Sequence, residues 1–291
     1  MTLRRRDGLQ FVGNWMSASD NITVLANGRS AKDYWTDFFM HRELLYFLAW
    51  RDILVRYKQT LIGAGWVLIR PLLTMLVFTV VFGKIAGLSS GPIPYSLVVF
   101  AGMLPWYFFS SSLTDCSNSL VTNAQLLSKV YFPRLIVPFS TMLVSLVDFT
   151  ISGVLLVGLM LWFGHWPDWH MLFLPFFVVL AATFSMGLGL WAAALNVRYR
   201  DFRHLIPFFL QLGIYVSPVG YSAELIPEKW RLLYSLNPMV GIIAGFRWSI
   251  LGGDTQLYWP SVVIAAFAGV LLTFTGIRYF RKAEASFADV I

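Results

Sequence analysis

Residues 47–71 read FLAWRDILVRYKQTLIGAGWVLIRP, and the rest of the chain can be interpreted outward from this stretch. Its first half carries apolar or aromatic residues three or four positions apart, namely Phe47, Trp50, Leu54, Tyr57 and Leu61. This spacing predicts a helix with one apolar stripe. Because the helix is also rich in cations, we expect it to lie flat on an anionic membrane surface.

The opposite face of this helix and its downstream end carry different signals. Asp52 and Arg56 stand one helical turn apart, so the spacing predicts an ion pair between them on the polar face, which continues to Gln59 and Gly63. Gly63 and Gly65 permit a bend, and from Trp66 to Phe82 the chain is almost wholly apolar. A surface helix that feeds directly into a membrane span is therefore expected.

The composition is that of an integral membrane protein. Hydrophobic residues make up 57% of the 291 residues and charged residues only 13%, about half of the roughly 25% typical of soluble domains. The one Cys excludes an internal disulfide. The net charge of +7 does not indicate nucleic-acid binding, because the cations stand beside apolar segments, as topology signals do.

Six segments are long and apolar enough to cross a bilayer core of about 30 Å. They are Ala64–Ala86, Tyr95–Leu113, Leu135–Phe163, Leu172–Leu195, His204–Tyr221 and Pro260–Phe280. Nine Lys and Arg precede Gly63, and further cations fall in the second–third and fourth–fifth connections and in the tail. The positive-inside rule therefore predicts that both termini are cytoplasmic.

Three parts of the chain outside these spans have a distinct character. Residues 1–36 form a polar cytoplasmic leader. The inner connection TNAQLLSKVYFPR predicts a short helix at 123–132, capped by Thr122 or Asn123 and ended by Pro133. The outer connection at 222–253 contains the apolar run Met239–Leu251, which is too short to cross, so a re-entrant helical hairpin is expected there.

Few residue patterns point to catalysis or to a bound cofactor. Gly83–Lys84 resembles the end of a phosphate-binding loop, but Phe78 occupies the position of its first glycine. Gly187 and Gly189 in GLGLW indicate close helix packing. His165, Asp168 and His170 could ligate a metal, but the neighbouring Trp166 and Trp169 favour an ordinary interfacial loop. We expect no metal site, no catalytic residue and no cofactor in this chain.

Two features within the spans are candidate substrate contacts. Arg70 lies about 9 Å along the first span, at a depth that matches Asp115 better than Asp148. Arg70 is therefore predicted either to snorkel or pair with Asp115, or to contact an anionic substrate. A dense aromatic cluster follows in the second span, where it either packs helices together or lines a passage for sugar rings: Trp106, Tyr107, Phe108 and Phe109.

Several motifs together resemble the type-2 ABC transporter permeases that export polysaccharides. They are RDILVRYKQTLIGAGWVLIRPLLTMLVFTVVFG, PYSLVVFAGMLPWYFF, LLSKVYFPRLIVP, LNVRYRDF and LNPMVGIIAGFRWSILG, in the order that this family shows. The resemblance runs from about Glu43 to the end of the chain. One departure is Arg70, where relatives are expected to have Gln or an apolar residue.

The resemblance implies an architecture and a set of partners. The fold would be an all-α membrane protein with a six-helix permease domain at 63–291, preceded by an amphipathic interface helix within 37–62. The permease would form a homodimer with two copies of a separate ABC ATPase, which binds ATP and Mg. The residues through which the interface helix would act are Trp50, Arg51, Asp52, Arg56 and Tyr57. The 123–132 helix would be the coupling helix, which docks on the ATPase. Its docking residues would be Leu126, Leu127, Lys129, Tyr131 and Arg134.

The resemblance also implies a function. The chain would be a multi-pass protein of the bacterial inner membrane that passes a lipid-linked polysaccharide outward, with undecaprenyl-linked O-antigen favoured over capsular polysaccharide or teichoic acid. A drug or lipid exporter of the same type is an alternative, but it predicts a large extracytoplasmic domain or a fused ATPase. A membrane glycosyltransferase is a second alternative, and it predicts acidic donor-sugar motifs that this sequence does not show.

Overall fold

The computed structural model describes residues 31–58, 65–88, 91–199, 201–252, 257–284 and 287, and every regular element within these ranges is a helix. Five helices are long and apolar enough to cross a membrane, counted over the described residues. They are α3 (Gly65–Phe78) with its π-helical continuation η1 (Thr79–Ile85), α4 (Tyr95–Thr122), α6 (Ile136–Trp162), α7 (Leu174–Arg198) with η2 (Trp169–Phe173), and α11 (Trp259–Glu284).

The fifth predicted span corresponds to α8 (Phe202–Val216), which has only 15 residues. At 1.5 Å per residue this helix is about 22 Å long, shorter than a bilayer core of about 30 Å. The number of crossings therefore stays a prediction. Most of the predicted spans otherwise match the observed helices closely, since long apolar runs are the most reliable sequence signal.

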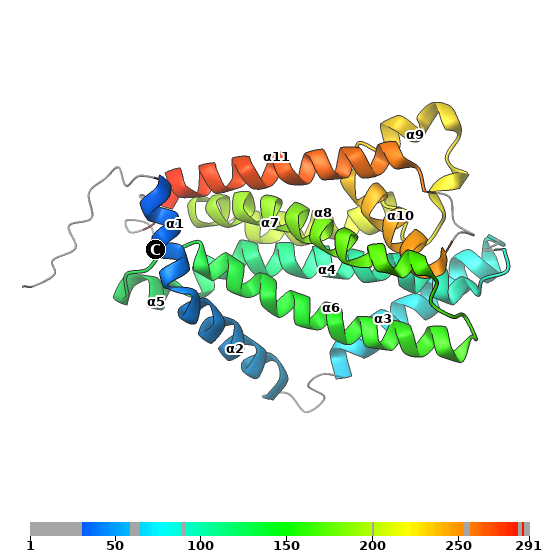
Figure 1. Cartoon of the computed structure of the whole chain (residues 1–291), viewed down its shortest axis with the longest axis horizontal. Coiled ribbons are helices and arrows are strands. Elements are labelled where there is room, and N and C mark those ends of the chain that lie inside the picture. The colour runs from blue at the N-terminus through cyan, green and yellow to red at the C-terminus, as the bar shows by residue number, and fades with distance from the viewer. Residues whose placement is uncertain are drawn as a thin grey trace, which may run out of the picture.

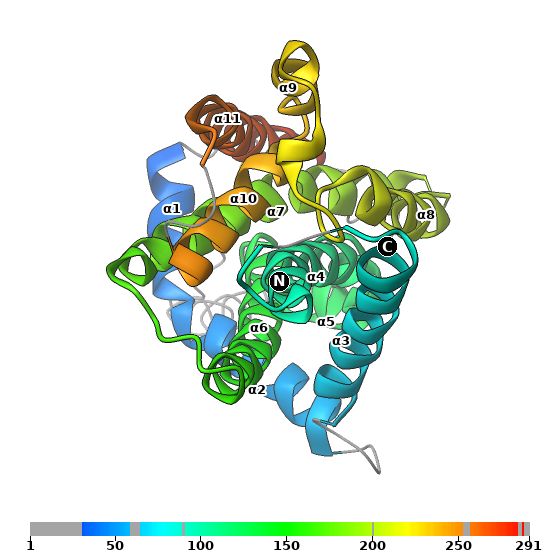
Figure 2. The ribbon, with the colours of Figure 1, turned by 90° about the vertical axis from the view of Figure 1, so that its right-hand side faces the viewer.

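Helix α4 is the centre of the bundle. The most apolar part of α4 is 67% buried, whereas that of α3 is only 11% buried. α4 packs against α3, α6, α7, α8 and α10 (Pro238–Leu251), and Figure 2, which looks along the bundle, shows it surrounded by them. The arrangement makes α4 the scaffold on which the other helices are positioned.

Helices α7 and α11 approach each other most closely at two glycines. A Cβ added to Gly187 would lie 2.6 Å from the backbone N of Thr273, and one added to Gly276 would lie 2.8 Å from the carbonyl O of Gly187. Thr273 also donates a hydrogen bond of 2.7 Å to the Thr183 carbonyl of α7. The prediction that the glycines of GLGLW serve close helix packing is confirmed.

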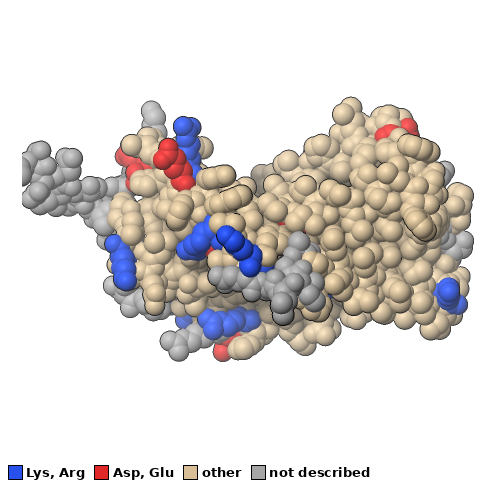
Figure 3. Space-filling model, turned by 90° about the horizontal axis from the view of Figure 1, so that it is seen from below, with Lys and Arg blue, Asp and Glu red and all other residues tan. Residues whose placement is uncertain are grey.

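The two ends of the bundle differ in character (Figure 1). One end, here called the α5 end, carries α1 (Ala31–Met40), α5 (Ala124–Lys129) and the last turns of α11, around a second apolar core that includes Leu120, Leu135 and Phe280. The other, the α9 end, carries α9 (Glu228–Tyr234). On the face in Figure 3, Lys and Arg gather towards the α5 end, and a long uncharged surface follows.

The predicted surface helix is two helices, α1 and α2 (Arg42–Lys58), which meet at His41. Its apolar stripe is exposed, with Phe47 62% and Trp50 50% accessible, while Leu48 and Ala49 are buried. The polar face does not meet solvent as expected, because α2 packs against α6 and places Arg56 between helices. The predicted positions Gln59, Leu61 and Gly63, and residues 1–30 of the leader, lie outside the described residues.

The connection predicted to lie outside contains the 3-10 helix η3 (Ala223–Leu225) and the two α-helices α9 and α10. α9 follows Pro227, and α10 starts with the side-chain oxygen of Asn237 accepting a 3.1 Å bond from the Met239 amide. Eleven of the fourteen residues of α10 are buried. The apolar run Met239–Leu251 therefore packs inside the bundle, against α4, α7 and α11. Whether this pair of helices is re-entrant stays a prediction.

Candidate functional site

A cavity of about 1010 Å³ lies beside α4, with walls from α2, α3, α6 and α8. Its lining combines aromatic rings, hydroxyl groups and four charged side chains. The aromatic residues are Trp66, Trp106, Tyr107, Phe108, Phe149 and Tyr215; the charged residues are Arg56, Arg70, Asp115 and Asp148. This is the largest of the described cavities and the only one of them that joins rings and charges in this way.

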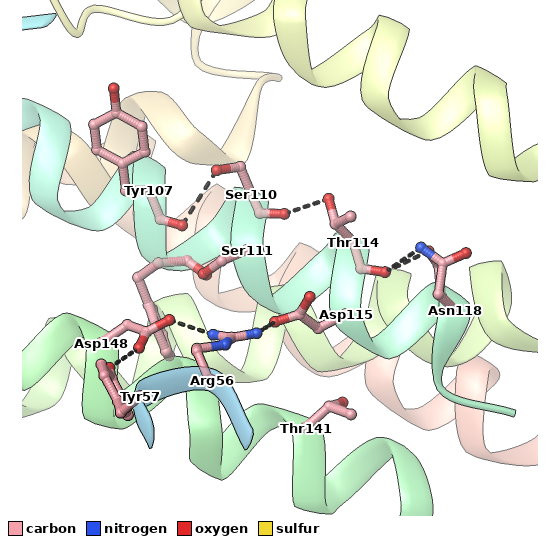
Figure 4. A network of polar contacts seen from close by, with 12 residues as sticks. Arg56, Tyr57, Tyr107, Ser110, Ser111, Thr114, Asp115, Asn118, Thr141 and Asp148 are labelled. Atoms are coloured by element: carbon pink, nitrogen blue, oxygen red, sulfur yellow. Dashed lines mark hydrogen bonds and ion pairs between the residues drawn. The ribbon is translucent and has the colours of Figure 1, made fainter. Parts of the chain in front are cut away.

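A polar stripe on α4 forms the floor of this cavity. Its residues recur every three or four positions: Tyr107, Ser110, Ser111, Thr114 and Asp115 line this cavity, and Asn118 continues the stripe into a smaller cavity. Several of these side chains donate to a carbonyl of their own helix, as Thr114 does to Ser110 at 2.7 Å and Asn118 to Thr114 at 3.0 Å. Their oxygen lone pairs remain as acceptors along the stripe (Figure 4). This stripe was not predicted, although the helical spacing of its polar residues within an apolar span was a usable signal.

An ion-pair network links three helices at the cavity wall. The Arg56 guanidinium of α2 donates from Nη2 to Asp115 Oδ2 of α4 at 2.7 Å and from Nη1 to Asp148 Oδ2 of α6. The Tyr57 hydroxyl donates to the other oxygen of Asp148 (Figure 4). Burial lowers the pKa of Arg56, but the carboxylates of Asp115 and then Asp148 outweigh this and hold it above its ordinary value. One cation therefore serves two carboxylates.

Two predicted ion pairs are wrong. Asp52 pairs with its neighbour Arg51 at 2.7 Å rather than with Arg56, and Asp115 pairs with Arg56 rather than with Arg70. Both errors have one cause. The spacing of residues along α2 could not show that this helix packs against α6, and that packing turns Arg56 inward to the two carboxylates.

Arg70 occupies a different position in the cavity from Arg56. Its guanidinium carbon lies 5.9 Å from the ring centroid of Tyr107. The Tyr107 hydroxyl donates to Thr74 Oγ1 at 2.8 Å, which ties α3 to α4 one turn beyond Arg70. None of the ion pairs within the described part of the chain involves Arg70. Arg70 thus faces the cavity as a cation whose charge no described carboxylate neutralises.

The predicted aromatic cluster divides between two spaces. Trp106, Tyr107 and Phe108 line the cavity, whereas Phe109 lines a separate apolar groove of about 500 Å³ between α4, α7 and α8. Trp106 lines both. The reason is geometric, because consecutive residues on an α-helix point about 100° apart. Phe109 therefore points away from the wall that Tyr107 and Phe108 share, and whether the cluster lines a substrate passage stays a prediction.

The residues assigned to the coupling helix differ in exposure. Lys129 and Tyr131 are exposed, but Leu126 and Leu127 are half-buried against the core of the α5 end. Arg134 is held at the end of α11, where its amide donates to Glu284 Oε1 at 2.9 Å and its Nη1 to the Glu284 carbonyl at 2.7 Å. The exposed residues of this segment are therefore Lys129, Tyr131 and the neighbouring Val130.

The start of α5 is tied to α2. Arg51 donates from Nη2 to Asn123 Oδ1 at 2.7 Å, and Nδ2 of the Asn123 side chain donates to the Ser119 carbonyl at 2.9 Å. Asn123 is thus the N-cap residue of α5, one of the two predicted positions, but its side chain makes no capping bond because it is engaged elsewhere. A cavity of about 320 Å³ beside this contact is lined by residues of α2, α4 and α6, among them Arg51, Asp115 and Thr141, and by Asn123, which precedes α5.

The acidic and histidine residues near the α9 end form a compact contact. Asp168 accepts a 2.7 Å bond from the Trp169 amide and lies 2.7 Å from His170 Nδ1. The His170 ring packs between Trp169 and Trp248, with centroid distances of 4.0 and 4.6 Å. Among the described residues, no group of three His, Cys, Asp or Glu side chains could hold a metal ion.

Arg247 has a structural role that the sequence analysis missed. Its side chain is 5% exposed, and its guanidinium donates to the backbone carbonyls of Val98 at 3.1 Å and of Val219 and Tyr221 at 2.7 Å each. A Cβ on Gly102 would lie 2.7 Å from Arg247 Nη2, so a larger residue at 102 would displace it. Arg247 holds α10 to α4 and to the segment after α8.

Comparison with known proteins places these features in a family. The model of the ABC-2 type transporter family matches residues 43–251. The O-antigen export system permease protein RfbA of Myxococcus xanthus is 30% identical over 257 residues, covering 88% of this chain and 98% of that protein. A protein of the same name from Klebsiella pneumoniae is 27% identical, covering 86% and 95%. The polysialic acid transport protein KpsM of Escherichia coli is 22% identical, covering 80% and 91%.

The matched region begins within α2 and ends with α10, so it includes the whole cavity, the ion-pair network and the polar stripe of α4. The alignment with RfbA extends over nearly the full length of that relative. The chain therefore belongs to the ABC-2 type transporter family, in the group of permeases that includes the O-antigen export proteins.

Proposed function

We propose that this chain is the permease subunit of an ATP-driven exporter that moves a lipid-linked polysaccharide, most simply an undecaprenyl-linked O-antigen, across the bacterial inner membrane. The observation that carries the proposal is the large cavity beside α4. Its rings can support the apolar faces of sugars, and the hydroxyl oxygens of Ser110, Ser111 and Thr114 can accept hydrogen bonds from them. A surface of this kind binds sugar chains without selecting one fixed pose.

The relatives support the choice of substrate. The relatives with the highest identity quoted above are named O-antigen export permeases, and KpsM, which is named for polysialic acid transport, is less similar. O-antigen is therefore the preferred cargo, with capsular polysaccharide as the alternative. A cavity that runs past polar and aromatic side chains suits either of these sugar polymers.

The proposed assembly follows the family. Two copies of this chain would pair so that their cavities face a shared passage, and two copies of a separate ABC ATPase would bind at the α5 end. That end would be cytoplasmic and would hold both termini. Helices α1 and α2 would form the interface element, α5 the coupling helix, and α9–α10 the re-entrant pair at the outer face. Helix α8 would provide the sixth crossing together with the residues that flank it.

The export function can be tested in cells. Deleting the gene should abolish surface polysaccharide and cause lipid-linked polysaccharide to accumulate inside, and the wild-type gene should reverse both effects. Unchanged surface polysaccharide in the deletion strain would contradict the proposal. The purified chain alone should hydrolyse no ATP.

The docking end can be tested by co-purification with the ATPase. Val130→Asp should lower recovery of the partner, because Val130 is 50% exposed beside α5 and a buried interface would have to desolvate the new charge. The matched control is Leu232→Asp, since Leu232 is 59% exposed on α9 at the opposite end of the bundle. Equal recovery for both variants would remove the α5 end as the docking site.

A further inference from the structure

The apolar groove beside α8 has a continuous hydrocarbon-like lining. Its walls are formed by α4, α7, α8 and the start of α10, and nearly all of the lining side chains are apolar, among them Phe109, Leu113, Phe184, Leu188, Phe209 and Leu212. Residues from Phe202 to Val216 contribute to it. At 1.5 Å per residue, these positions extend over about 21 Å, enough for an extended hydrocarbon chain rather than for a compact ligand.

Helix α8 separates this groove from the polar cavity. Gln211, Ile214 and Tyr215 face the cavity, whereas Phe209 and Gly213 face the groove. The partition is thin at one place, because Leu210 and Trp106 line both spaces.

Trp106 closes the partition against a glycine. A Cβ on Gly213 would lie 2.7 Å from Cη2 of the Trp106 ring, so the indole rests directly on the bare backbone of α8. Ile206 is the one buried residue of α8, while Phe202, Leu210 and Ile214 are half-buried against the main core. The two spaces therefore adjoin across one aromatic side chain.

The polar side of this partition offers an unneutralised cation. Arg56 is shared by two carboxylates, but Arg70 has no ion pair among the described residues and lies beside Tyr107, the residue that follows Trp106. A guanidinium binds phosphate oxygens through two parallel hydrogen bonds. The cavity thus presents a phosphate-binding group next to the junction with the apolar groove.

We propose that the cavity and the groove together form one binding site for the lipid-carrier end of the substrate. The phosphate-bearing head contacts Arg70, and the hydrocarbon chain lies in the groove along α8, with Trp106 and Leu210 at the junction. The inference rests on the proposed function, which supplies a substrate with a phosphate-linked lipid. The new element is the position on one permease subunit of the phosphate head and of the hydrocarbon tail.

The test is direct binding to the purified full-length chain in detergent, without the ATPase. The probe is labelled geranylgeranyl diphosphate, compared with geranylgeraniol, which lacks the head, and with inorganic pyrophosphate, which lacks the chain. Arg70→Gln should weaken binding of the diphosphate roughly tenfold or more, the size of a lost charged hydrogen bond, and leave geranylgeraniol unchanged. Arg70→Lys should restore part of the loss. The matched control is Arg278→Gln, an exposed arginine of α11 that is remote from the cavity lining.

A second variant tests the groove. Leu212→Trp should weaken both isoprenoids several-fold and leave pyrophosphate unchanged, because Leu212 is 48% exposed at the groove rim, where a larger ring narrows the groove without disturbing the core. Val179→Trp is its control, since Val179 is 63% exposed on α7 and does not line the groove.

Two results would overturn the site. One is wild-type diphosphate binding by Arg70→Gln. The other is displacement of the probe by phosphatidylglycerol as effectively as by unlabelled probe, which would make the site one for ordinary anionic lipid. Either result leaves the export function standing, because export is measured separately by surface polysaccharide. Conversely, if the deletion strain showed that the chain does not export polysaccharide, lipid binding measured on the purified chain would still stand.

Discussion

Replacing Arg56 with Met should destabilise the protein by stranding two carboxylates. Arg56 is the shared partner of Asp115 and Asp148, which lie on different helices. The side chains are 33%, 28% and 18% exposed, in the order Arg56, Asp115 and Asp148. Breaking a fully buried pair costs about 3–5 kcal/mol, and partial exposure screens the charges. We therefore expect a loss of about 2–3 kcal/mol in the free energy of unfolding.

The assay is thermal unfolding of the purified chain in detergent. A loss of this size corresponds to a fall in melting temperature of roughly 3–5 °C for a chain of this length. Neutralising both acids as well, in Arg56→Met/Asp115→Asn/Asp148→Asn, should recover most of the loss because no charge is then stranded. Arg198→Met, at an exposed arginine outside the network, is the control and should melt like the wild type.

Two results would refute this reasoning. If Arg56→Met melts within about 2 °C of the wild type, the network contributes little to stability. If the triple variant melts at as low a temperature as the single variant, the loss of stability comes from the packing of the apolar stem of Arg56 against α4 and α6 rather than from its charge. In that case the network would serve only to position α2.

Two further predictions concern other parts of the bundle. Gly187→Ala should lower the melting temperature strongly, because the new Cβ would lie 2.6 Å from a backbone atom of α11. The control is Gly158→Ala, whose new Cβ meets nothing within 4 Å and which should be neutral or slightly stabilising through helix propensity. Equal melting temperatures of the two variants would contradict the close α7–α11 contact. The Trp169 amide and then His170 hold the pKa of Asp168 below its usual range, so the stability from this carboxylate is present above its unfolded pKa of about 3.9 and is lost as the pH falls through the lower folded value. Below pH 4, the melting temperature of the wild type should therefore fall more steeply with pH than that of Asp168→Asn. Parallel plots of melting temperature against pH for the two proteins would contradict the stabilising role of the Asp168 carboxylate.

The sequence by itself determined the class of the protein and the positions of most of its helices. Long apolar runs leave few alternatives to membrane-crossing helices, because backbone groups in lipid must be bonded within the segment. Gly187 and Gly189 also indicated close packing correctly, because a missing side chain in a membrane helix commonly lets a neighbouring helix approach. Each of these inferences depends on local spacing alone.

The tertiary structure decided which residues meet. Arg56, Asp115 and Asp148 are far apart in the chain and come together only because α2 packs across α4 and α6. Spacing along one helix could therefore not identify the partner of Arg56, or show that Arg70 stays without one. The same holds for Trp106 and Gly213, whose contact separates the polar cavity from the apolar groove. Contacts between distant segments depend on how helices pack, which periodicity within a helix does not encode.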